Sequence, residues 1–132
     1  MSEGAELVEV VVERSKWHRG KGTVGSALLT LEGKMCCLGF VARQSGYALQ
    51  DMFGCGTPAS LAAKTPFESP RGLVATLVEP EPGFLRFGAK TNTLVCAELI
   101  NANDDKALTD ANREATLQDL ALKAGFRLRF VD

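Results

Sequence analysis

The chain has 132 residues, of which 45% are hydrophobic and 23% charged, and its formal net charge is −1. This length fits a single domain with its own hydrophobic core. The near-neutral charge excludes a protein that binds nucleic acid through its overall electrostatics, because only a local basic patch could attract a polyanion. No apolar run approaches the ~20 residues that cross a bilayer, which excludes a membrane-spanning helix.

The first ten residues, MSEGAELVEV, carry early glutamates and lack the basic segment of a signal peptide. We therefore expect the protein in the cytoplasm of the cell that makes it. The four cysteines are expected to stay reduced in that compartment.

Two strands are predicted near the start of the chain, on either side of a basic, glycine-rich segment. Residues 7–13 alternate valine with glutamate, and residues 26–31, SALLTL, are typical of a second strand. Residues 36–45 place apolar side chains at helical spacing, and Gly46 follows as the expected terminating glycine. A short helix is predicted over 48–53.

Residues 54–92 are expected to form a loop-rich insertion. Glycine, proline, serine and threonine dominate 54–72, which predicts mostly loop. Residues 73–78 and 84–87 flank the sequence EPEPG, and this arrangement indicates a hairpin with a proline-stiffened tip.

A helix is predicted over 93–102, with Leu94, Ala97 and Ile100 on its buried face. The polar residues 103–105 are expected to cap its C-terminus and to begin an exposed loop. Their density resembles a calcium-binding loop, but the glycine and the closing glutamate of such a loop are missing.

The last helix has the clearest boundaries. Thr109 is a favourable N-cap, and Gly125 is expected to stop the helix. Its predicted buried stripe consists of Leu117, Leu120, Ala121 and Ala124. The strand predicted after it, residues 126–131, alternates apolar residues with arginine.

The first and last predicted strands have complementary faces. Glu9 and Glu13 alternate with valine in one, and Arg127 and Arg129 alternate with apolar residues in the other. Opposite charges across neighbouring strands contribute ~0.2–1 kcal/mol per pair. We therefore expect these two strands to be neighbours in one sheet.

Together these elements predict a single α+β domain over residues 1–132. Its expected architecture is a small, mainly antiparallel sheet packed against three or more helices. The sequence contains no internal repeat and no linker that would divide it.

The most unusual stretch is residues 14–25, RSKWHRGKGTVG, which surrounds the only tryptophan and the only histidine with cations. Its glycines match G-x-G-x-x-G, but a strand rather than a helix is predicted to follow, which argues against a dinucleotide site. A phosphate or another anion remains a candidate ligand. The alternative is a solvated turn whose tryptophan covers the sheet edge. The candidate binding residues are Lys16, Trp17, His18, Arg19 and Lys21.

Cys36 and Cys37 begin a predicted helix, where the positive end of the helix dipole lowers a thiol pKa. His18 is the only histidine that could act as their base. A small cysteine-dependent enzyme is therefore the alternative function. We expect at least one of the two cysteines to be buried and structural. The spacing of the cysteines does not fit a zinc site, and no metal or cofactor is predicted.

Several short motifs occur in a recognisable order: W-x-R-G at 17–20, G-K-M-C-C-L-G at 33–39, N-D-D at 103–105 and R-E-x-x-L at 113–117. This order resembles a group of short bacteriophage and prophage proteins that have no established activity. The resemblance implies an accessory protein, for example in counter-defence, that binds a host protein or a small anionic or nucleotide ligand. The basic Trp17 segment is the expected contact, and the oligomeric state is left open.

Overall fold

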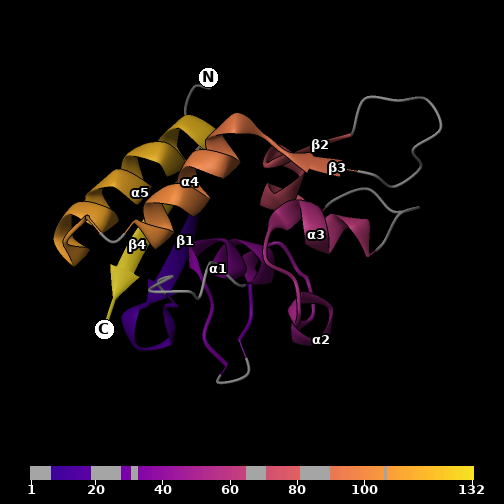
Figure 1. The fold of residues 1–132 in the computed structure, drawn as a ribbon, viewed down its shortest axis with the longest axis horizontal. Helices are drawn as coiled ribbons and strands as arrows, with labels where there is room; N and C mark the ends of the chain where they lie inside the picture. Colours follow the sequence, from indigo (N-terminus) through magenta and orange to yellow (C-terminus); the bar gives the residue numbers. More distant parts are fainter. Residues whose placement is uncertain (1–6, 19–27, 31–32, 65–70, 81–89, 106) are drawn as a thin grey trace.

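The computed structural model describes residues 7–18, 28–30, 33–64, 71–80, 90–105 and 107–132. Within these residues the chain forms a mixed α+β fold (Figure 1), as predicted. No helix among them is long and apolar enough to cross a membrane.

Strands β1 (Val8–Glu13) and β4 (Phe126–Val131) lie side by side, with Val8 opposite Phe126 and Glu13 opposite Val131. The prediction that the two strands are neighbours is confirmed, and Arg129 donates to Glu9 at 3.1 Å. The pairing is parallel, however, so the expected antiparallel arrangement of this sheet is wrong. Alternating side chains specify which face of a strand is buried, but not the direction in which it runs.

The described part of the chain contains five α-helices. They are α1 (Cys37–Gln44), α2 (Leu49–Met52), α3 (Pro58–Ala63), α4 (Leu94–Asp104) and α5 (Asp110–Ala124). Helix α5 packs on β4 and α4 packs on α5, while α1 contacts both β1 and α4. A second strand pair is formed by β2 (Val78–Pro80) and β3 (Lys90–Asn92). Figure 1 shows α3 and this pair at the opposite end of the molecule from β4.

Threonine caps determine where three of the helices begin. The Oγ1 atoms of Thr57, Thr93 and Thr109 accept hydrogen bonds from backbone N–H groups at 3.1–3.2 Å. Helix α5 ends at Gly125, whose φ of 96° is strained for any residue with a Cβ. The boundaries predicted for α5 are therefore confirmed.

The described parts of the insertion contain more regular structure than expected. The predicted loop over 54–72 contains α3, which Thr57 caps and which begins with Pro58. The strand predicted over 73–78 is replaced mainly by a 3₁₀ helix, η2 (Gly72–Thr76). A hairpin-like pair does form, between β2 (Val78–Pro80) and β3 (Lys90–Asn92), whereas residues 84–87 lie outside the described part.

The strand predicted over 26–31 is absent from the part of it that the structure describes, residues 28–30, which form bends. Leu28 is nevertheless completely buried, and its backbone N–H donates to the Cys55 carbonyl at 2.9 Å. This segment therefore packs against α1 and does not form a strand of the sheet.

Helix α4 buries a different face from the predicted one. Its buried residues are Cys96, Leu99, Ala102 and Asn103. Leu94 is 79% exposed, so the expected face of Leu94, Ala97 and Ile100 is wrong. A polar residue, Asn103, occupies the last buried position of the helix.

Candidate functional site

The basic segment after β1 is held against the start of α1. Its first residues form a 3₁₀ turn, η1 (Arg14–Lys16). The Met35 N–H donates to the Lys16 carbonyl at 2.8 Å, and the His18 N–H donates to the Met35 carbonyl. Trp17 lies between these two bonds and pairs with Met35 as a parallel bridge. We call residues 14–18 the Trp17 strap.

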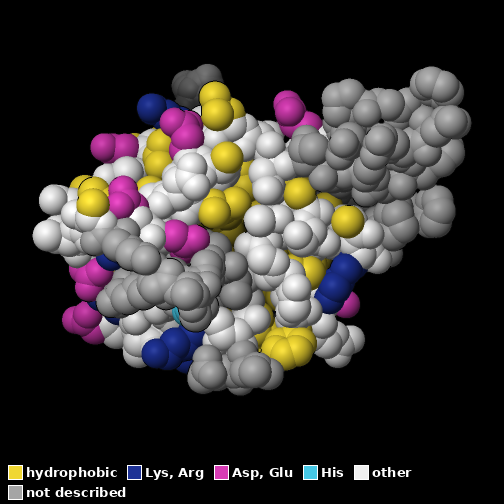
Figure 2. Space-filling view, in the orientation of Figure 1, with side chains coloured by type: hydrophobic (Ala, Val, Ile, Leu, Met, Phe, Trp, Pro, Cys, Tyr) yellow, Lys and Arg dark blue, Asp and Glu magenta, His cyan; other side chains and the backbone are white. Residues whose placement is uncertain are grey.

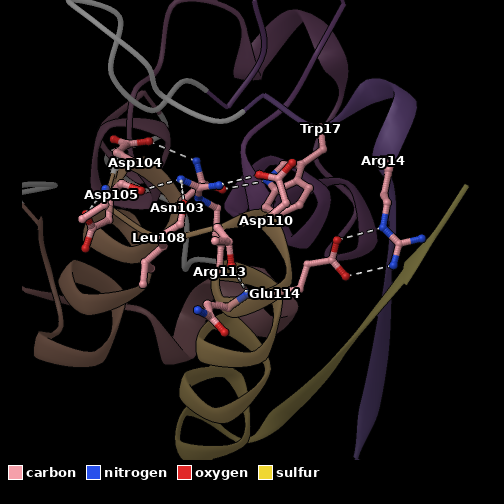
Figure 3. Close-up of polar contacts among 12 residues, drawn as sticks. Arg14, Trp17, Asn103, Asp104, Asp105, Leu108, Asp110, Arg113 and Glu114 are labelled. Atoms are coloured by element: carbon pink, nitrogen blue, oxygen red, sulfur yellow. Dashed lines mark hydrogen bonds and ion pairs between the residues drawn. The ribbon is translucent and has the colours of Figure 1, made fainter.

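Trp17 is part of the core, with only 3% of its surface exposed. Its ring centroid lies 4.8 Å from that of Phe130 on β4, and its Nε1 donates to Asn103 Oδ1 at 2.8 Å (Figure 3). Of the two roles left open for Trp17, its burial agrees with a ring that packs against the sheet and not with an exposed ring that stacks on a ligand. A tryptophan beside cations is available to a ligand only when its indole N–H has no partner within the fold. In Trp17 this N–H is bound to Asn103.

Asn103 connects three parts of the chain. Its Oδ1 also accepts from the Cys37 N–H at 3.2 Å, and its Nδ2 donates to the His18 carbonyl and to Asp104 Oδ1, both at 3.1 Å. This side chain therefore caps the N-terminus of α1, for which Cys36 supplies no side-chain cap. The sequence predicted an exposed loop over 103–105, so the capping role of Asn103 was not predicted. The pattern that could have indicated its burial is its spacing of four residues from Leu99, which places it on the apolar stripe of the helix.

A second polar contact connects the strap to the opposite end of the chain. Arg14 donates to both carboxylate oxygens of Glu114 on α5, at 2.8 and 2.9 Å, and to Asp132 at 2.9 Å. The Glu114 and Asp132 carboxylates raise the pKa of Arg14 above its already high usual range. Arg14 is therefore committed to these partners.

Lys16 lies at the edge of a cleft of about 500 Å³ between the outer face of β1 and α1. Val11, Met35 and Phe40 contribute apolar lining. Arg43 of α1 also lines the cleft, and one of its nitrogens donates to the Tyr47 carbonyl at 2.6 Å. The cleft therefore combines an apolar floor with two cationic side chains.

One acidic residue lines the same cleft. Glu13 lies 3.8 Å from the Lys16 ammonium, and both side chains are about half exposed, at 49% and 58%. Pairs of this length at the surface contribute little stability. The three charged residues of the lining, Glu13, Lys16 and Arg43, leave a net positive charge.

The other predicted binding residues are not brought to the cleft by any described contact. His18 is half-buried, and its backbone is hydrogen-bonded to Met35 and Asn103. Arg19 and Lys21, together with the whole G-x-G-x-x-G sequence, lie outside the described residues.

All four cysteines are buried and free. Burial raises the pKa of Cys36 to about 11 and that of Cys96 to about 12, and it raises the pKa of Cys37 well above its usual range. The backbone N–H groups at the start of α1 lower the pKa of Cys36, as expected for a helix N-terminus, but by less than burial raises it. The prediction that Cys36 or Cys37 is buried is confirmed for both, and their structural role stays a prediction.

In the described part of the chain, no group of three or more histidine, cysteine, aspartate or glutamate side chains lies close enough to hold a metal ion. The acidic residues that end α4 are engaged otherwise, because Asp104 accepts from Asn103 and Asp105 from the Ala107 N–H.

No family model, curated protein or solved structure matches this chain. A function is therefore proposed from the geometry of the cleft and of the Trp17 strap.

Proposed function

We propose that the protein binds a small anionic ligand in the cleft between β1 and α1. One observation carries this proposal: Lys16 and Arg43 both line a cleft of about 500 Å³ whose lining also includes Val11, Met35 and Phe40. Ligand pockets combine such apolar walls with a few polar groups that fix orientation, and they measure ~300–1,000 Å³. A nucleotide or an organic acid has the matching chemistry, an apolar body with an anionic group.

The two cations have complementary properties. Arg43 uses one nitrogen for the Tyr47 carbonyl, and the other N–H donors of its planar guanidinium suit a phosphate or carboxylate. Lys16 acts as a mobile point charge, and its loose pair with Glu13 can be exchanged for a stronger anion. The hydrogen bonds of the Trp17 strap to Met35 and Asn103 hold the Lys16 backbone in place before the ligand arrives.

The resemblance to short phage proteins motivates an accessory role for this binding, with counter-defence as one form of it. In that role the ligand is a nucleotide or another small anion of the host. Binding of a host protein through the same basic surface is the other form of the proposal, and it predicts no affinity for small anions.

Thermal unfolding tests the proposal with a panel of nucleotides and carboxylic acids. At least one anion should raise the melting temperature, because a ligand that binds only the folded state stabilises it. Lys16→Glu and Arg43→Glu should each abolish that shift. Lys123→Glu is the matched control, because Lys123 is exposed on α5 and does not line the cleft. A shift that survives Lys16→Glu would contradict binding in the cleft, and a panel without any shift would contradict the small-anion form of the proposal and leave the host-protein form.

The alternative, a cysteine-dependent enzyme, makes a different prediction. A nucleophilic thiolate would react with a thiol-specific reagent within seconds at pH 7.5. Because Cys36 and Cys37 are each 1% exposed, we expect all four thiols to react only after the protein is unfolded in urea. Rapid modification of one thiol in the folded protein would favour the enzyme.

A further inference from the structure

A second hollow lies on the face of the molecule that carries α4 and α5. It has a volume of about 380 Å³ and is lined by Glu98, Asn101, Ala102, Asp105, Leu108, Thr116 and Leu120. Ala102 and Leu120 are the most buried of these residues, at 8% and 9% exposure, and they contribute an apolar base. We call this hollow the α4–α5 groove.

The groove is electrostatically negative. Among the residues that the structure describes, its lining contains two carboxylates, Glu98 and Asp105, and no cation. Glu98 is exposed and forms no ion pair with any described residue. The C-terminus of α4, the negative end of its dipole, lies at Asp104, and the last turn of α4 carries no basic residue to compensate.

A buried arginine fixes one wall of the groove. Arg113 of α5 is 2% exposed and donates to the Asp105 carbonyl, to the Leu108 carbonyl at 3.3 Å and to Asp110 Oδ1 at 2.7 Å (Figure 3). Its charge is paired with Asp110, whose side chain is 56% exposed. Arg113 therefore holds the connection between the helices in place without neutralising the carboxylates of the groove.

The negative and apolar groups continue along α4. Leu94, Glu98, Asn101 and Asp105 are spaced by four, three and four residues, which places them along one side of the helix. At 1.5 Å per residue this stripe is about 16 Å long. Figure 2 shows hydrophobic and acidic side chains next to each other on the face over α4 and α5. A stripe of this length fits a peptide segment better than a single small molecule.

We propose that the α4–α5 groove docks a basic, amphipathic segment of a partner protein. Apolar side chains of the segment occupy the hollow over Ala102 and Leu120, and its lysines or arginines lie against Glu98 and Asp105. This is the helix-in-groove mode of recognition, in which apolar contacts supply affinity and the charges at the rim select the partner.

Synthetic peptides test this docking on the intact protein. The probe is a 14-residue peptide of leucine and lysine in helical register, with one analogue that replaces lysine by glutamate and another that replaces leucine by serine. We expect the leucine–lysine peptide to bind about tenfold more tightly than either analogue. Backbone amide shifts on binding should concentrate at Glu98, Ala102, Leu108 and Leu120.

Charge-reversal variants distinguish peptide binding in the groove from non-specific attraction of the peptide to an acidic surface. Glu98→Lys should weaken binding of the leucine–lysine peptide by about tenfold. Asp119→Lys, an equal change at an exposed position of α5 outside the groove, should change it by less than about twofold. Absence of binding, equal loss in both variants, or equal binding of the serine analogue would overturn the proposal. Lys16→Glu should leave peptide binding unchanged, which keeps this test independent of the anion cleft.

Discussion

Asn103 uses the full hydrogen-bonding capacity of an amide side chain in a completely buried position. Its oxygen accepts from Trp17 Nε1 and the Cys37 N–H, and its nitrogen donates to the His18 carbonyl and to Asp104. A buried amide is favourable only when all of these groups are satisfied, because each lost partner leaves another polar group without water. The residue therefore determines how the strap, α1 and α4 meet.

Replacing Asn103 with leucine should lower the free energy of unfolding by about 2–4 kcal/mol, since it leaves the Trp17 and Cys37 N–H groups buried and unpaired. Urea unfolding followed by tryptophan fluorescence measures this change. Asn101→Leu is the matched control, because Asn101 is exposed on the same helix, and it should change stability by less than about 0.5 kcal/mol. Similar stability of the two variants would contradict the role given to Asn103.

The buried thiols predict a loss of stability in base. Because burial raises the pKa of Cys36 to about 11, the folded protein keeps this proton where the unfolded chain releases it. The contribution of Cys36 is therefore complete below the pKa of the unfolded thiol and is lost as the pH rises through about 11. Across this interval the contribution of Cys36 to the free energy of unfolding should fall by up to about 1.4 kcal/mol per pH unit.

Cys36→Ala removes this titration and should flatten the pH dependence of stability between about pH 9 and 11. The measurement is urea unfolding at several pH values, with the two proteins compared at each one. Parallel curves for wild type and Cys36→Ala would show that the Cys36 thiol has an ordinary pKa in the folded protein.

At the scale of elements, α1 and the segment before it depend on one glycine. Gly39 lies in the first turn of α1, where Leu28 and Met35 cross the helix. A Cβ at this position would overlap the Leu28 carbonyl oxygen and lie 2.7 Å from the Cβ of Met35. Because one of these atoms belongs to the backbone, the contact cannot be relieved by rotating a side chain. The absence of a side chain at Gly39 is what allows the close approach.

The sign of the change in unfolding free energy caused by Gly39→Ala distinguishes the effect of this packing from that of helix propensity. Propensity alone predicts that alanine stabilises a helix by about 1 kcal/mol relative to glycine. The overlap with Leu28 predicts a loss of about 1–3 kcal/mol, as is typical of overpacked cores. Chemical unfolding decides between them, and a more stable Gly39→Ala protein would show that the segment over α1 shifts freely.

Elements with local signals could be predicted from the sequence. Thr109 and Gly125 specify the ends of α5 through their own backbone geometry, and the alternation of Phe126, Leu128 and Phe130 specifies the buried face of β4. Helix α3 carried a similar signal in Thr57 and Pro58, which the surrounding glycines and prolines obscured. The direction of β4 has no local signal, because it depends on α5 returning the chain across the sheet.

The candidate site could be predicted only in part, for a related reason. Lys16 was predicted to be exposed beside a ligand surface, and it does line the cleft. Arg43 was missed, because only the packing of α1 on β1 brings it near Lys16. Trp17 was misassigned because its partner Asn103 lies 86 residues away in the sequence, where no pattern near Trp17 can indicate it.

At the scale of the whole molecule, Arg14 joins the beginning of the fold to its last helix and strand. Its bidentate contact with Glu114 is partly buried, with the Glu114 side chain 18% exposed, whereas the pair of Arg129 with Glu9 is exposed on both sides. Arg14→Ala should therefore lower the melting temperature more than Arg129→Ala, which should have little effect. Differential scanning calorimetry measures both, and equal shifts would contradict this ranking.

The parallel pairing of β1 with β4 has a consequence for how the protein is made. More than a hundred residues separate Val8 from its partner Phe126, so β1 leaves the ribosome long before any strand exists for it to join. The edge of β1 that pairs with β4 lacks this partner throughout that interval. The sheet can close only after β4 has been synthesised, and until then a chaperone that covers β1 would protect the chain from aggregation.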